Sequence, residues 1–72
     1  MMLAMRRKVL ETFKGWLDKT RFVEIQPDEI IVVEETSPIV GNLIQVQRNV
    51  VTEGWGYVMV DQDELESNSV PI

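Results

Sequence analysis

The side chains that most often carry out catalysis are scarce in this chain of 72 residues. Cysteine and histidine are absent, which leaves no thiol nucleophile, no imidazole base and neither of the common zinc ligands. Three serines remain, Ser37, Ser67 and Ser69, and there is no histidine to activate any of them. The sequence therefore predicts a protein that is not an enzyme and that holds no cofactor or metal.

Carboxylates are the other candidates for chemistry. Glu34 and Glu35 are adjacent in a segment with strand character, so their side chains point to opposite faces and do not converge on a substrate. Asp61, Asp63 and Glu66 match a calcium loop only in outline, because the glycine and the distal glutamate of an EF-hand loop are missing. We interpret both groups as solvent-exposed acids.

Basic side chains are concentrated at the N-terminus. Residues 1–21 hold six of the seven cations and carry a net charge of +4, whereas residues 22–72 carry −9, which gives −5 for the chain. The cations predicted to contact phosphates are Arg6, Arg7, Lys8 and Lys14. These cations indicate nucleic-acid binding as an alternative function. It ranks second because the acidic pI of about 4.5 disfavours a polyanionic ligand.

Residues 2–19 are predicted to form an amphipathic helix. At 100° per residue, the apolar side chains fall on one broad face and most charged ones on the opposite side. The apolar face consists of Met2, Met5, Val9, Leu10, Phe13, Trp16 and Leu17. We expect this face to pack on a sheet. Insertion in a membrane surface is disfavoured, because Glu11 and Asp18 interrupt the basic side.

Two hairpins are predicted after the helix. Their four strands cover residues 21–26, 29–36, 43–52 and 57–61, which are rich in β-branched side chains. A turn at Pro27 and Asp28 pairs Val23 with Val32. A turn within residues 53–56 pairs Arg48 with Asp61 in the second hairpin.

These elements predict a single α+β domain over residues 1–61, in which an N-terminal helix packs on an antiparallel sheet of about four strands. The alternative is a small open barrel of the SH3-like, Sm-like or OB type with a leading helix, an analogy of architecture that no motif carries. Residues 62–72 are predicted to be an acidic, flexible tail. Alternatively, the last three residues, Val70 to Ile72, anchor on a sheet edge or in a partner's groove.

Small size also bears on function. A chain this short buries too little surface to be very stable alone, and it has no disulfide or metal to help, so association is the remaining source of stability. We predict a cytoplasmic, non-enzymatic interaction or structural module that forms homo-oligomers or docks on a larger protein. The predicted interface residues are Phe13, Trp16, Trp55 and Tyr57, with Trp55 placed at a hairpin tip between two glycines.

Overall fold

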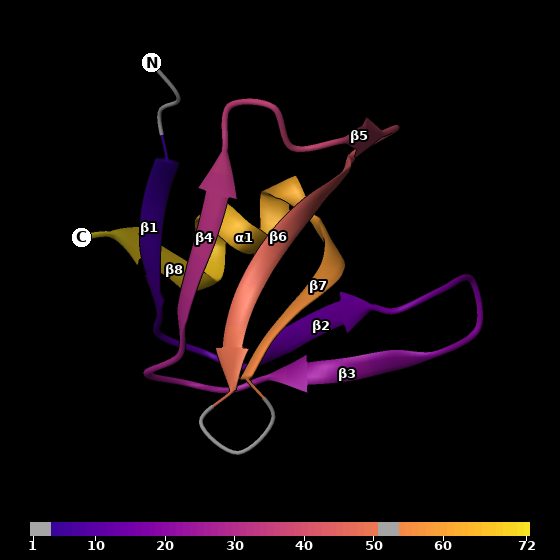
Figure 1. Cartoon of the computed structure of the whole chain (residues 1–72). Coiled ribbons are helices and arrows are strands. Elements are labelled where there is room, and N and C mark those ends of the chain that lie inside the picture. Colours follow the sequence, from indigo (N-terminus) through magenta and orange to yellow (C-terminus); the bar gives the residue numbers. More distant parts are fainter. Residues whose placement is uncertain (1–3, 51–53) are drawn as a thin grey trace.

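The computed structural model describes residues 4–50 and 54–72 and shows an antiparallel sheet with one short helix (Figure 1). The strands are β1 (Ala4–Val9), β2 (Phe13–Trp16), β3 (Phe22–Ile25), β4 (Ile30–Glu34), β5 (Ile39–Val40), β6 (Leu43–Val50), β7 (Gly54–Asp61) and β8 (Ser69–Pro71). The helix α1 (Gln62–Asn68) lies between β7 and β8.

The order of strands in the sheet is β3-β2-β7-β6-β4-β1-β8, and β5 pairs with β6 outside this path. All of these pairs are antiparallel. The long strands β6 and β7 curve across the middle, and β2 and β3 project as a hairpin from one end (Figure 1). The first and last strands of the chain, β1 and β8, are therefore neighbours in space.

The core lies on one side of this curved sheet. It is formed by the buried side chains of Val9, Phe13, Ile25, Ile31, Val33, Val46, Val58, Val60 and Leu65. Leu65 belongs to α1, which covers the core and contacts β2, β7 and β8. Since buried side chains alternate with outward-pointing ones along β2, β4 and β7, the other face of the sheet is directed toward solvent.

The predicted N-terminal helix is wrong. Residues 4–9 and 13–16 are strands, and the helix found among the described residues is α1, near the C-terminus. Arg7 and Val9 are buried while Arg6 and Lys8 are exposed, which is the two-residue period of a strand rather than the period of a helix. The alternative prediction, a small open barrel with a leading helix, is wrong for the same reason, because residues 4–9 and 13–16 are strands.

Close packing at Gly15 helps to explain why this segment is extended. A Cβ atom at Gly15 would lie 2.9 Å from Cγ2 of Val58 and 3.0 Å from Cδ1 of Ile25. A glycine that costs stability in a helix is here the residue that lets β2 approach the core. Pairing with strands far away in the sequence outweighs the helical pattern of the apolar residues.

The first predicted hairpin is also wrong, although its strands exist. β3 pairs with β2, and β4 pairs with β1 and β6, so Val23 does not face Val32. The chain between them turns at Asp28, which has a φ of 72° and donates its N–H to the carbonyl of Val9 at 2.8 Å. This turn sends the chain from one end of the sheet to its other half.

The second predicted hairpin is present with a different register. β6 and β7 pair so that Leu43 faces Asp61 and Gln47 faces Tyr57, five positions away from the predicted alignment. Arg48 therefore does not face Asp61 but lies opposite Gly56. Residues 51–53, between the two strands, lie outside the described residues.

Where the sequence predicts a flexible tail, the structure has α1 and β8. Asp61 caps α1, since its Oδ1 accepts the N–H groups of Asp63 at 2.9 Å and Glu64 at 3.3 Å. The same carboxylate accepts a hydrogen bond from Asn42 at 3.0 Å. Over the described residues, the structure contains no helix of the length and apolar character needed to span a membrane.

Candidate interaction surface

The side of the sheet that faces away from the core carries the strongest candidate site. Val58 and Val60 of β7 are buried, so Tyr57 and Met59 lie on the opposite side, and Met59 faces Trp16 of β2. We call this surface the outer face and define it by seven residues: Lys14, Trp16, Phe22, Gln45, Gln47, Tyr57 and Met59.

An aromatic cluster occupies the β2–β3 end of the outer face. The rings of Trp16 and Phe22 are 5.3 Å apart and tilted by 59°, a favourable arrangement for two aromatic rings. The Nζ atom of Lys14 lies 4.5 Å from the centre of the Phe22 ring and 6.0 Å from that of Trp16. Phe22 remains 46% exposed, so the cluster presents apolar surface and a cation together.

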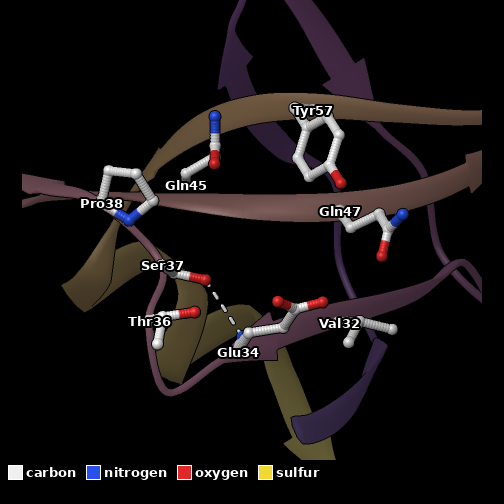
Figure 2. A pocket seen from close by; sticks show the side chains of 8 residues that line it. All are labelled: Val32, Glu34, Thr36, Ser37, Pro38, Gln45, Gln47 and Tyr57. Carbon is white, nitrogen blue, oxygen red and sulfur yellow. Dashed lines mark hydrogen bonds between the residues drawn. The ribbon is translucent and has the colours of Figure 1, made fainter. Parts of the chain in front are cut away.

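A groove of about 170 Å³ adjoins the other end of the outer face. It is lined by Val32, Glu34, Thr36, Ser37, Pro38, Gln45, Gln47 and Tyr57. Figure 2 shows Gln45, Gln47 and Tyr57 on one side of it and Glu34 and Thr36 on the other. Its polar lining and small size suit a single side chain of a partner better than a separate ligand.

The loop between β2 and β3 is held by Asp18. Its Oδ1 accepts the N–H groups of Thr20 at 2.9 Å and Arg21 at 2.8 Å, and its Oδ2 lies 2.6 Å from Nε of Arg21. These hydrogen bonds, that from the Thr20 N–H above all, hold the pKa of the Asp18 carboxyl well below its ordinary value. The loop thereby fixes the hairpin that displays Trp16 and Phe22.

The structure separates the four predicted interface residues. Trp16 and Tyr57 lie on the outer face, and Tyr57 is 59% exposed. Phe13 is 5% exposed and belongs to the core, so it is not available to a partner. The backbone of Trp55 lies in β7 opposite Asn49 rather than at a hairpin tip, and its side chain is outside the described residues.

The four predicted phosphate contacts do not form one basic surface. Arg6 and Lys8 are exposed on β1, and Lys14 is on β2 within the aromatic cluster. Arg7 points inward and donates from Nε to Oγ of Ser69 at 2.7 Å. Nucleic-acid binding remains a prediction, but the basic helix on which it was based is absent.

Four members of the outer face were not predicted from the sequence: Phe22, Met59 and the two glutamines on β6, Gln45 and Gln47. The signal for the glutamines is the alternation of polar and apolar side chains in residues 44–47, and that for Met59 is its alternation with Val58 and Val60, which are buried. The assignment of Phe22 to the outer face needs the register of β2 with β3, which places it beside Trp16.

Two of the three serines make structural hydrogen bonds, and the third, Ser67, is exposed on α1. The hydroxyl of Ser37 accepts the Glu34 N–H at 3.0 Å, and Ser69 is buried with Arg7. In residues 4–50 and 54–72 there is no group of three or more carboxylates placed to hold a metal ion. No family model, curated protein or solved structure matches the chain.

Proposed function

We propose that this protein is a cytoplasmic, non-catalytic interaction module that binds another protein through the outer face. The observation that carries the proposal is the pair formed by the half-buried Trp16 and the exposed Phe22, with Lys14 against it, on the same face as Met59 and Tyr57. Exposed aromatic groups beside a cation are typical of the residues that contribute most to protein interfaces.

The core does not need these aromatic side chains. Nine apolar residues already form a buried cluster on the other side of the sheet, and Tyr57 and Phe22 lie outside it with half of their surface exposed. Large apolar groups that gather on one exposed surface are uncommon unless a partner covers them. Burying Tyr57 and Phe22 is therefore the expected source of binding energy.

The groove supports a polar contact at the edge of the same surface. The carboxylate of Glu34 lies across the groove from the amides of Gln45 and Gln47 (Figure 2). This set of one anion and two amides suits a lysine, arginine or amide side chain of a partner. Such a contact gives orientation, while the aromatic cluster gives most of the affinity.

The test compares capture of cellular proteins by the tagged wild-type chain and by Trp16→Ala, Tyr57→Ala and Leu10→Ala variants. Leu10 is also half exposed but lies outside the outer face, so it serves as the matched control. Each enriched protein is then purified and its Kd is measured by calorimetry. We expect both outer-face variants to bind at least about tenfold more weakly than wild type and Leu10→Ala. Equal binding by all four chains would contradict the proposal.

A further inference from the structure

The two outer edges of the sheet differ in how open they are. The edges are formed by β3 at one end and β8 at the other. β8 has three residues, and Pro71 within it has no N–H to donate, which are two common ways of protecting an edge. β3 contains no proline, so its edge presents both donors and acceptors.

The register shows which backbone groups point out of the sheet at β3. The N–H of Leu17 donates to the carbonyl of Arg21 at 2.9 Å, so hydrogen bonds between β2 and β3 recur at every second position from there. Trp16 and Phe22 form the next, non-hydrogen-bonded pair. The N–H and C=O groups of Trp16 therefore point toward β7, with which Trp16 pairs, and those of Phe22 point toward the open edge of β3. Glu24 is oriented in the same way.

From this edge we infer that the protein forms a dimer in which β3 pairs with β3 of a second copy, antiparallel and about a two-fold axis at Val23. In this register Phe22 of each copy faces Glu24 of the other. The outward N–H and C=O groups of both residues then form four hydrogen bonds across the interface. The carbonyl of Glu24 also lies 3.4 Å from Nη2 of Arg48, so it accepts the bond from the second copy with its other lone pair. The two Val23 side chains, which are half-buried at the end of the core, meet at the axis.

Neighbouring registers are less favourable for identifiable reasons. If Phe22 faced itself, Glu24 would face Thr20, whose N–H is already donated to Asp18 at 2.9 Å. If Glu24 faced itself, two carboxylates would lie side by side at the interface, which is destabilising. In the proposed register each Glu24 instead has Lys14 of its own copy on its other side, because Lys14 and Glu24 are paired in the hairpin.

Charge favours this edge over other contacts between two copies. Residues 13–25 carry three cations and two acids, a net charge of +1, although the whole chain carries −5. The acidic residues of α1 and of the end of β7 are not on β3, because β2 lies between β3 and β7 in the sheet and α1 follows β7. A dimer through β3 therefore joins the chains where their mutual repulsion is least.

The dimer has a consequence for the outer face. The strand order across the junction becomes β7-β2-β3-β3-β2-β7, so the two clusters of Trp16 and Phe22 lie on one continuous surface. Since pairing at β3 closes on itself through a two-fold axis, it yields a dimer and not a fibre. The inference rests on the edge of β3 and does not depend on the proposed function.

Light scattering over a range of protein concentrations tests the dimer, using the full chain, Glu24→Pro and Glu24→Ala. Proline at position 24 removes an N–H that points to the open edge, so it breaks no hydrogen bond within the sheet. We expect a mass approaching twice 8.3 kDa for wild type and Glu24→Ala, and 8.3 kDa for Glu24→Pro. Circular dichroism establishes that each variant is folded.

If Glu24→Pro fails to fold, amide hydrogen exchange of the wild-type chain, measured at several protein concentrations, tests the dimer instead. Exchange at Phe22 and Glu24 is expected to slow as concentration rises, whereas exchange at Ser69 on the opposite edge stays unchanged. A wild-type chain of 8.3 kDa at every concentration would overturn the inference. A dimer with unchanged exchange at Phe22 and Glu24 would also overturn it, since another surface would then form the contact.

Discussion

Arg48 and Glu29 form a two-point ion pair that ties β6 to the turn between β3 and β4. Nε of Arg48 donates to Oε1 of Glu29 at 2.9 Å and Nη2 donates to Oε2 at 2.6 Å. The side chains are only 12% and 14% exposed, so this pair is shielded from water far more than a surface ion pair. Arg48 also lies 3.4 Å from the carbonyl of Glu24, which links the pair to the end of β3.

Replacing Glu29 with alanine is expected to lower the free energy of unfolding by about 2–4 kcal/mol, because Arg48 then remains shielded without its carboxylate. Urea unfolding followed by circular dichroism measures the change. Glu35→Ala is the matched control, since Glu35 is exposed. A double variant, Arg48→Met with Glu29→Ala, is expected to lose less than the sum of the two single changes. Similar losses for Glu29→Ala and Glu35→Ala would contradict this account.

Acid is expected to destabilise the protein through Asp18. Its folded-state pKa lies below the ordinary value of 3.8, so in acid the unfolded chain binds a proton that the folded chain does not. The stabilisation is complete above the ordinary pKa and is lost as pH falls toward the folded pKa. Asp61 contributes in the same direction, chiefly because Asn42 donates a hydrogen bond to its carboxylate.

The measurement is the dependence of the urea midpoint on pH between neutrality and acid. Wild type is expected to lose stability more steeply below the ordinary carboxyl pKa than Asp18→Asn, which keeps an acceptor for the Thr20 N–H but carries no charge. A direct NMR titration of the Asp18 carboxyl should give a midpoint below 3.8. If the two chains showed the same pH dependence, Asp18 would not be the group responsible.

Most strands after residue 21 are predictable from sequence, but only one of their pairings is, that of β6 with β7, and in a different register. Residues 30–34 and 43–50 are strands as expected from their β-branched side chains. Their pairing depends on the long crossovers that place β1 between β4 and β8 and β7 between β6 and β2. A local turn at Pro27 and Asp28 carries no information about such distant pairings.

The N-terminal segment shows why a convincing periodicity can mislead. Its apolar residues fit a helical face, but Arg7 interrupts the alternation that would indicate a strand. Arg7 is buried because Ser69, which is 62 positions away, accepts its hydrogen bond. The outer face was predicted only in part. Trp16 and Tyr57 were among the predicted interface residues, whereas Phe22 joins them only through the register of β2 with β3.

Gly15→Ala is expected to destabilise the fold by about 1–3 kcal/mol, because the new Cβ would lie 2.9 Å from Cγ2 of Val58. Gly56→Ala is the matched control, since a Cβ there meets nothing within 4 Å. Thermal unfolding of both variants measures the difference. If residue 15 were in a helix, Gly15→Ala would instead stabilise the protein, because alanine has a higher helix propensity than glycine. A stabilised Gly15→Ala chain would therefore count against the extended conformation of β2.

Ser69→Ala tests whether the end of the chain is a fixed part of the fold. Ser69 is 3% exposed, its Oγ accepts from Nε of Arg7 at 2.7 Å, and its hydroxyl donates to the carbonyl of Leu65. Alanine leaves the buried Nε of Arg7 without that acceptor, although Nη2 keeps its bond to the Ser69 carbonyl at 2.9 Å. The expected loss is about 1–3 kcal/mol in the free energy of unfolding.

Ser67→Ala is the matched control for this change, because Ser67 is an exposed serine of α1 that lies two residues before Ser69. Urea unfolding should separate the two variants, and amide exchange in residues 69–72 should accelerate only in Ser69→Ala. A flexible tail would give the opposite pattern, with rapid exchange in the wild type and no effect of either serine. Slow exchange at Val70 in the wild type, lost when Ser69 is changed, would show that Arg7 holds β8 against β1.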